Sequence, residues 1–253
     1  MLYEHQFDAS FDHPAFDGTP RVLLLATTPR CGSHFLGHIL SADGRFGCPF
    51  EYLHPSNMTR WREVLGHPRG APLIPALASR RTSPLGIFAV KAHWPHFSRH
   101  WGRQRGTLAA QPAAVLRLYR RDVLAQAVSF DVASQTGQWI SAQPGTCVPT
   151  YRAGGIRRRA AEIRAENAAW TAWAGRNPDV PQIAIAYEDF ARDPSSDLRR
   201  IRELLLPDDP REIAFTVATE RQANPVSRKF MARFRARAKP EDAWMLEPQD
   251  LRA

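Results

Sequence analysis

The sequence predicts an α/β protein in which one parallel β-sheet is flanked by helices on both faces. Residues 21–27 form a continuous apolar run, as expected of a strand buried on both sides. Further strand-like runs alternate with helical patterns, which favours parallel β-α-β connections. With 43% hydrophobic and 23% charged residues, the 253-residue chain has a globular composition. We therefore expect a single domain over residues 21–253, after an irregular lead-in at residues 1–20.

A helix is predicted directly after the first strand. Phe35, Leu36, Ile39 and Leu40 recur at a spacing that places them on one face of a helix. Gly44 is a typical residue for the end of such a helix. The first strand and this helix are therefore joined by a short turn.

The middle of the chain continues the alternation of strands and helices. Residues 54–84 are rich in Pro, Gly and Arg, which indicates a variable insertion of short helices and loops. Strands are predicted at residues 86–91 and 113–119. A helix is predicted at residues 122–135, with Asp122 as its capping residue.

The second half of the chain is predicted to contain a long helix and a further strand. Residues 157–176 have the pattern of a long helix, and residues 182–187 have the pattern of a strand. Helices are expected after Pro194 and after Pro210. The tail from Arg221 onward is basic, and its structure is not predicted by its pattern.

The charge of the chain indicates an anionic partner. Lys and Arg number 34 against 25 Asp and Glu, which gives a formal net charge of +9. Several of the arginines cluster around residues 152–164 and in the tail, where Arg228 and Lys229 stand together. Clustered positive charge suits either a nucleic acid or a small phosphorylated ligand, and charge alone does not separate the two.

The sequence also predicts where the protein is found. No apolar run approaches the roughly 18–20 residues of a membrane span, and the N-terminus lacks the pattern of a secretory signal. The three cysteines include no CxxC pair, which argues against disulfides and a zinc site. We therefore expect a cytoplasmic protein.

The turn at residues 27–34 has the features of a phosphate-binding loop. Gly32 permits close approach of an anion, and the following helix contributes its partially positive N-terminus. Arg30 adds a fixed charge and Ser33 a hydroxyl donor. The Gly-x-x-x-x-Gly-Lys-Ser/Thr motif of nucleotide triphosphatases is missing, as is the Gly-x-Gly-x-x-Gly dinucleotide motif. The turn is therefore expected to hold another nucleotide-like anion.

A second candidate site lies at the end of the third strand. Arg121 ends that strand and Ser129 follows eight residues later on the next helix. This spacing can bring a guanidinium and a hydroxyl onto one phosphate.

These motifs, in this order, resemble those of sulfotransferases that use 3′-phosphoadenosine 5′-phosphosulfate (PAPS). The turn at residues 28–33 is similar to their 5′-phosphosulfate loop, and Arg121 and Ser129 are similar to their 3′-phosphate pair. The segments around Lys91 and His93, and around Tyr187, also resemble family motifs. Residues 47–52, 125–130 and 135–139 look most like the bacterial branch that includes trehalose 2-sulfotransferase and the nodulation-factor sulfotransferase.

The resemblance implies a fold related to P-loop kinases and the transfer of a sulfuryl group to a hydroxyl of a small-molecule or carbohydrate acceptor. It implies a set of donor-binding residues: Arg30, Cys31, Gly32, Ser33, His34, Arg121, Ser129 and Tyr187. Cys31 stands where the family usually has Ser or Thr, and His34 stands where it generally has Thr. The basic pair Arg228 and Lys229 resembles a pair that reaches the 3′-phosphate in relatives.

The resemblance also implies the catalytic residues. Glu51 matches the glutamate base of the trehalose-type branch, and His93 matches the catalytic histidine of the animal cytosolic branch. A carboxylate or an imidazole can accept the proton of the attacking hydroxyl. Arg30, with Lys91 second, is expected to stabilise charge on the bridging oxygen. We expect no metal.

Two other classes remain open at this point. A basic nucleic-acid-binding protein would use the tail and would bind oligonucleotides with a steep salt dependence. A kinase with a P-loop-like turn that departs from the Walker motif would bind ATP. Dimers in the branch that the chain resembles suggest a homodimer by analogy.

Overall fold

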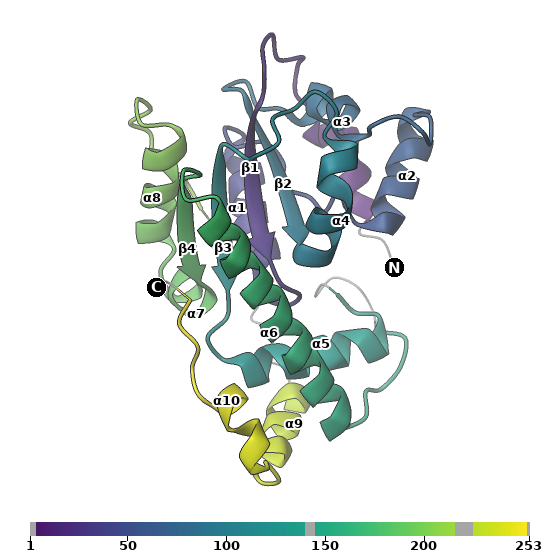
Figure 1. The fold of residues 1–253 in the computed structure, drawn as a ribbon, viewed down its shortest axis with the longest axis vertical. Coiled ribbons are helices and arrows are strands. Elements are labelled where there is room, and N and C mark those ends of the chain that lie inside the picture. The colour runs from purple at the N-terminus through teal and green to yellow at the C-terminus, as the bar shows by residue number, and fades with distance from the viewer. Residues whose placement is uncertain (1–3, 140–144, 216–224, 252–253) are drawn as a thin grey trace.

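Figure 1 shows a computed structural model of the chain, which describes residues 4–139, 145–215 and 225–251. Its centre is a parallel sheet of four strands in the order β2-β1-β3-β4. The strands are β1 (Arg21–Thr27), β2 (Ile87–His93), β3 (Ala114–Tyr119) and β4 (Gln182–Ala186).

Helices connect the strands and continue beyond them. They are α1 (Ser33–Asp43), α2 (Pro55–Leu65), α3 (Ile74–Arg81), α4 (Trp94–Gln104), α5 (Val123–Thr136), α6 (Ala153–Arg176), α7 (Tyr187–Arg192), α8 (Ser195–Leu205), α9 (Pro225–Arg235) and α10 (Ala243–Leu246). Short 3₁₀ helices are η1 (Glu4–Phe7), η2 (Ala9–Phe11) and η3 (Pro240–Asp242).

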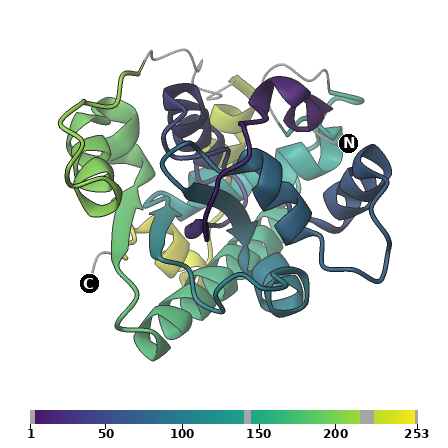
Figure 2. The same ribbon diagram turned by 90° about the horizontal axis from the view of Figure 1, so that it is seen from above.

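Both faces of the sheet are covered, as predicted. On β1, Val22 and Leu24 pack into one apolar core with side chains of α2, α3, α4 and α6. The alternate residues Leu23 and Leu25 pack into a second core with α1, α7 and α8. Successive side chains of a strand point to opposite faces, so a strand buried on both sides is apolar throughout. Figure 2 shows these layers from above. The predicted α/β class is confirmed.

The parallel arrangement brings the ends of three strands to one edge of the sheet. The register pairs Thr27 of β1 with His93 of β2, and β3 runs along the other side of β1. The turn after β1 therefore lies between the residues that follow β2 and those that follow β3. Strand, turn and helix at β1–α1 form the P-loop-like arrangement that the resemblance implied.

The segment before β1 packs against the domain through η1 and η2. The ring of Phe11 contacts that of Phe50, with centroids 5.0 Å apart. Arg81 is fully buried, and its Nε lies 2.9 Å from a carboxylate oxygen of Asp12. A buried charge needs a partner, and this segment supplies it.

Three details of the predicted elements are wrong. The helix predicted at 157–176 begins earlier, at Ala153. Gly155 in its first turn lets α6 approach α5, since a Cβ there would lie 2.5 Å from a carboxylate oxygen of Asp131. Tyr187 does not end the strand but begins α7. No helix follows Pro210 directly, since residues 211–215 are not helical; residues 216–224 lie outside the described part.

A third apolar cluster joins α5, α6, α9 and α10, so the basic tail is folded onto the domain in the residues described. In those same residues, no helix combines the length and apolar character that a membrane crossing requires.

Candidate active site

The turn after β1 has an unusual backbone at two residues. Gly32 has φ +90° and Arg30 has φ +65°, both in the left-handed region. The ring of Tyr187 lies directly over Gly32, where an added Cβ would stand 2.2 Å from the ring carbon Cδ2. Both the backbone conformation and this contact require glycine at position 32.

Gln126, on α5, fixes the turn from the side. Its buried amide donates to Thr28 Oγ1 at 2.8 Å and to the Pro29 carbonyl at 2.7 Å. We did not predict this residue, because a glutamine inside a helix gives no signal of a partner 98 residues away. The turn is thus held by hydrogen bonds as well as by its own geometry.

Arg30 points from the turn toward α5. Its Nε donates to Ser129 Oγ at 2.9 Å, and its guanidinium also donates to the Trp139 carbonyl. Among the described residues no carboxylate lies within ion-pair distance of Arg30. Burial, and the nearby charge of Arg120, lower the pKa of Arg30 to about 10, so it remains a cation at neutral pH. Arg30 is thus a partly buried positive charge that has no negative partner in the described part of the chain.

The structure does not bring Arg121 and Ser129 together as the spacing suggested. Arg121 donates to both carboxylate oxygens of Asp189, at 2.9 and 2.5 Å, while Ser129 is bonded to Arg30. These hydrogen bonds raise the pKa of Arg121. The predicted role of Arg121 in phosphate binding stays a prediction.

The adjacent Arg120 lies on the turn side of this region. Its guanidinium carbon stands 5.1 Å from the centre of the Tyr187 ring, the ring that lies over Gly32. Its Nε is buried without a hydrogen bond and lies 3.8 Å from Glu188. Glu188 accepts instead from the backbone N–H groups of Arg121 and Asp122, at 3.1 and 3.2 Å.

On the other side of the turn, the end of β2 carries a cluster around Glu51. Lys91 Nζ lies 3.1 Å from Glu51 Oε1, and His93 Nε2 lies 3.8 Å from the same oxygen. Lys91 is buried, with 3% of its surface exposed. The segment that carries Glu51 is held against β2, since the Lys91 N–H donates to the Phe50 carbonyl at 3.0 Å. The structure therefore brings the predicted base candidates and Lys91 into one place.

The charges in this cluster set its protonation. Burial would raise the pKa of Glu51, but Lys91, His93 and His34 hold it well below its usual range. Burial lowers the pKa of His93, and the charge of Lys91 lowers that of His34. At neutral pH the cluster thus contains an ionised carboxylate beside neutral imidazoles.

The hydrogen bonds of His93 assign its tautomer. Nδ1 lies 3.3 Å from the Thr27 carbonyl, which can only accept, and 3.1 Å from Thr27 Oγ1, whose hydroxyl donates to the Ala92 carbonyl. Nδ1 is therefore the protonated nitrogen, and the lone pair of Nε2 is on the side of Glu51.

Two residues that we did not predict, Asn57 and Gln6, form hydrogen bonds that fix the backbone at Glu51. Buried Asn57 donates to the Glu51 carbonyl at 2.9 Å and to Gln6 Oε1 at 3.2 Å. Gln6 belongs to η1, within the lead-in segment. Polar residues in a Pro- and Arg-rich stretch carry no sequence signal of such a contact.

A second buried carboxylate, Glu166 on α6, faces the start of α4. The backbone N–H of Trp94 acts to lower the pKa of Glu166, while the Oε2 of Glu166 is buried with no hydrogen-bond partner among the described residues. Burial, with the charge of Glu162, raises the pKa of Glu166 to about 7. Its position beside the residue after His93 was not predicted.

The other predicted donor residues lie where the turn meets α1. Cys31 is fully buried, and burial raises the pKa of its thiol. Ser33 begins α1 and is buried. Arg228 and Lys229 lie on α9, whose packing partner is α5.

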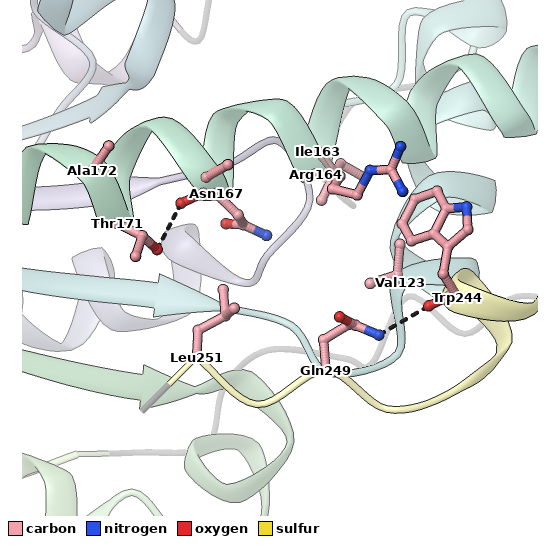
Figure 3. Close-up of a pocket in the computed structure, with 10 residues that line it drawn as sticks. Val123, Ile163, Arg164, Asn167, Thr171, Ala172, Trp244, Gln249 and Leu251 are labelled. Carbon is pink, nitrogen blue, oxygen red and sulfur yellow. Dashed lines mark hydrogen bonds between the residues drawn. The ribbon is translucent and has the colours of Figure 1, made fainter. Parts of the chain in front are cut away.

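A separate cavity of about 380 Å³ lies between α6 and the C-terminal segment (Figure 3). The guanidinium of Arg164 stacks on the Trp244 ring there, at 4.2 Å. None of the predicted site residues lines it. In the part of the chain described, no three His, Cys, Asp or Glu side chains are grouped to hold a metal ion.

The fold and the comparisons with known proteins define an α/β enzyme of the transferase class. The family model described as Stf0 sulphotransferase matches residues 90–237, more than half of the chain, and the protein belongs to this family. The match includes Lys91, His93, Arg120 and Tyr187. The turn after β1 and Glu51 lie outside it, so their assignment depends on the geometry.

Among solved structures, the chain is similar to a sulfotransferase from Alicyclobacillus acidocaldarius, with a TM-score of 0.42 and 16% identity. The alignment covers 90% of this chain and 95% of that one. No curated protein matches the chain.

Proposed function

We propose that the protein transfers a sulfuryl group from PAPS to a hydroxyl group of a small-molecule or carbohydrate acceptor. The observation that carries this proposal is the unbalanced positive charge of Arg30 and Arg120 on one side of a glycine turn, with an ionised carboxylate, Glu51, on the other. The first is suited to an anionic donor. The second is suited to an acceptor that must lose a proton.

The residues at the turn fit a phosphosulfate group. Arg30 has no carboxylate partner in the residues described, and Gly32, Ser33 and His34 stand at the N-terminus of an 11-residue helix. Cys31 contributes its backbone, because its side chain is buried in the core beneath the turn. Tyr187, over Gly32, offers an aromatic face beside the same turn.

Glu51 is the proposed base. In an in-line displacement the acceptor oxygen forms a bond to sulfur while the bond from sulfur to the bridging oxygen breaks, leaving the electron pair on that oxygen. The proton of the acceptor hydroxyl passes to Glu51, and the products are a sulfate ester and adenosine 3′,5′-bisphosphate. Lys91, 3.1 Å from Glu51, keeps the carboxylate ionised.

Charge on the leaving oxygen needs a cation. Arg30 is the proposed residue, because it is partly buried, remains charged and approaches from the turn itself. Lys91 is the second candidate. A fixed cation in a site of low dielectric stabilises developing charge more than the same cation in water.

His93 is a second candidate for the base, on a specific observation. Its Nδ1–H is held by Thr27, so its Nε2 has a free lone pair beside Glu51. A neutral imidazole here accepts the proton at Nε2, and the imidazolium that forms is stabilised by the Glu51 carboxylate, whose Oε1 lies 3.8 Å away.

The wider assignment follows from the same proposal. We expect a cytoplasmic enzyme with one domain over residues 21–253, in which the insertion at 54–84 borders the acceptor through its link to Glu51. A homodimer without nucleic-acid binding is the expected form. The proposal needs no metal.

Calorimetric titration with adenosine 3′,5′-bisphosphate tests the proposal. It is run beside ATP with Mg²⁺ and a single-stranded oligonucleotide, each at two salt concentrations. Selective binding of the bisphosphate is the expected result, and an acceptor screen with PAPS then follows. Oligonucleotide binding that falls steeply with salt, without bisphosphate binding, would refute it.

A further inference from the structure

The cavity between α6 and the C-terminal segment shares no lining residue with the turn after β1 or with the Glu51 cluster (Figure 3). Its volume of about 380 Å³ is within the range of roughly 300–1,000 Å³ that is typical of pockets for small molecules. Half of its lining residues are apolar and aliphatic: Val123, Ile163, Ala168, Ala172 and Leu251. We call these five residues the apolar wall. The cavity is therefore suited to the apolar body of a small molecule.

Hydrogen bonds hold the C-terminal side of the cavity in place. The N–H of Gln249 donates to the Arg121 carbonyl at 3.0 Å, and its side-chain amide donates to the Trp244 carbonyl at 2.9 Å. The next residue, Asp250, accepts from the Tyr119 hydroxyl at 2.5 Å. The opposite side is α6, a continuous helix of 24 residues. A site whose sides are already ordered loses less conformational entropy when a ligand binds.

A cation lies at one end of the cavity. The guanidinium carbon of Arg164 stands 4.2 Å from the centre of the Trp244 ring. This contact uses the face of the guanidinium and leaves the N–H groups at its edge available. In the described part of the chain, no carboxylate lies within ion-pair distance of Arg164, and the residue is exposed. Arg164 is therefore accessible to a carboxylate or sulfate group, which its donor geometry matches.

Two amide side chains face the same space. Asn167 lies three residues after Arg164 on α6, so the two side chains are neighbours on one face of the helix. Figure 3 shows the amides of Asn167 and Gln249 on opposite sides of the cavity. Within the residues described, the side-chain amide of Asn167 makes no hydrogen bond and Gln249 Oε1 accepts none. These groups can therefore orient the polar end of a ligand.

The surroundings of the cavity favour an anion over a cation. Thr171, at the other end of the lining, accepts from Arg117 Nη2 at 2.8 Å, and no carboxylate of the described residues is within ion-pair distance of Arg117. Asp250 lies between two lining residues, but it bonds to Tyr119 and stands 4.0 Å from Arg121 Nε. None of the described residues that line the cavity is acidic.

We propose that this cavity is a binding site for a small amphipathic anion, an apolar ring that carries a carboxylate or a sulfate group. The ring packs against the apolar wall. The anionic group pairs with Arg164, and the amides of Asn167 and Gln249 hydrogen-bond to its oxygen atoms or to polar substituents of the ring. The site is separate from the proposed sulfuryl transfer and does not depend on it.

Calorimetric titration with naphthoate, naphthyl sulfate and neutral naphthamide tests the proposal. Adenosine 3′,5′-bisphosphate is present at saturation, so that the probes do not enter the proposed donor site. Both anions are expected to bind with a Kd below about 1 mM. Naphthamide has the same shape without the charge, and it should bind at least about tenfold more weakly. Absence of binding by either anion, or equal binding of the amide, would overturn the proposal.

Two pairs of variants place the probes in the cavity. Ala168→Phe fills it from an exposed position of α6 and should weaken binding of the anions by at least about tenfold, whereas Ala165→Phe, exposed on α6 outside the lining, is the control. Arg164→Met removes the cation and should weaken binding by about 10- to 100-fold. Its control is Arg158→Met, which removes an exposed arginine of the same helix. Both controls should bind within about twofold of the wild type, and thermal unfolding checks that each variant is folded.

The outcomes separate this inference from the proposed function. Equal losses in Arg164→Met and Arg158→Met would show a non-specific charge effect and would overturn the site. Light scattering measures the molar mass of the wild type and of Ala168→Phe. A dimer that Ala168→Phe dissociates, without binding of the probes, would assign the cavity to a second copy of the chain and overturn the inference. Loss of bisphosphate binding in folded Ala168→Phe would show that the sites overlap and would also overturn it. A wild-type protein that binds the anions but not the bisphosphate would refute the donor assignment alone.

Discussion

The ends of β2 and β3 flank the same turn, and their charges are arranged in opposite ways. After β2, Lys91 and Glu51 neutralise each other at 3.1 Å, with neutral histidines around them. After β3, Arg120 has only a long ion pair and stands near Arg30, which has none in the described residues. The Lys91–Glu51 cluster, whose charges cancel, can accept a proton without binding an anion from solution. An unbalanced one is suited to hold an anion.

The largest expected effect is on turnover, and it comes from a substitution in the cluster after β2 alone. Glu51→Gln removes the proposed base but keeps the shape of the side chain, so turnover should fall by about 10²- to 10⁴-fold. Affinity for the bisphosphate should stay within about threefold, since the anion-binding side is untouched. Sulfate-ester formation and calorimetry measure the two quantities.

Matched variants make this result decisive. Glu63→Gln, an exposed carboxylate of α2 paired with Arg60, should leave both quantities unchanged. His93→Gln should cost less turnover than Glu51→Gln. A larger loss in His93→Gln would transfer the role of base to the histidine.

The next effect, on stability and on bisphosphate binding, comes from a substitution in the turn after β1, which lies between the ends of β2 and β3. Gly32→Ala places a Cβ 2.2 Å from Tyr187 Cδ2 at a φ of +90°, so it should destabilise the protein by about 1–3 kcal/mol and weaken bisphosphate binding. Denaturant unfolding and calorimetry check both changes. Gly66→Ala is the control: it also has a positive φ, +58°, but its Cβ would meet nothing within 4 Å. Equal effects of the two substitutions would show that the Tyr187 contact contributes nothing.

A smaller effect tests whether Lys91 sets the protonation of Glu51. The base must be ionised, so activity is lost as pH falls through its folded-state pKa. In the wild type this pKa is well below 4.5, and turnover should not fall from pH 8 to pH 5 through Glu51. In Lys91→Met the remaining effect of burial raises the pKa, and activity at pH 5 relative to pH 8 should drop about tenfold. Lys91→Arg keeps the charge and should keep the wild-type profile. The same profile in Lys91→Met would mean that another group controls Glu51.

The smallest effect compares Glu51 with Glu166, a buried carboxylate that forms no ion pair with the residues described. The folded-state pKa of Glu166, about 7, is above its ordinary value of 4.5, so the folded state binds more protons between these pH values. The free energy of unfolding therefore decreases as pH rises from about 4.5 to 7. Glu166→Gln removes this loss and should raise Tm at pH 8 by a few degrees, on the order of 1 kcal/mol, with no gain at pH 4.5. Thermal unfolding at the two pH values measures it, and a lower Tm at pH 8 would contradict the assignment.

The elements that the sequence predicts well depend on local patterns. The apolar run of β1, the stripe of α1 and the cap of α5 at Asp122 each follow from neighbouring residues, and the structure has all three. The parallel sheet follows from their order. The start of α6 was predicted at residue 157 but lies at Ala153, where Gly155 serves the packing of α6 on α5.

The site is predictable only in part, because its contacts join distant segments. The resemblance to sulfotransferases implies that Arg30, Lys91 and Glu51 belong to one site, and the structure places Lys91 and Glu51 together beside the turn that carries Arg30. It does not show that Ser129 pairs with Arg30, 99 residues away, or that Arg121 is taken by Asp189. Spacing limits which side chains can meet, but competition among partners decides which do.

The contact of Gln6 with Asn57 has a practical consequence for protein engineering. A variant that begins at β1 would lose Gln6, the hydrogen-bond partner of Asn57, which in turn donates to the Glu51 carbonyl. It would also lose Asp12, the ion-pair partner of the fully buried Arg81. A shortened version designed for crystallisation should therefore keep the segment from Glu4 onward. Because residues 4–20 make these contacts, a fusion partner joined rigidly to them would disturb the site. A spectroscopic probe placed in the same segment would report whether the site is intact.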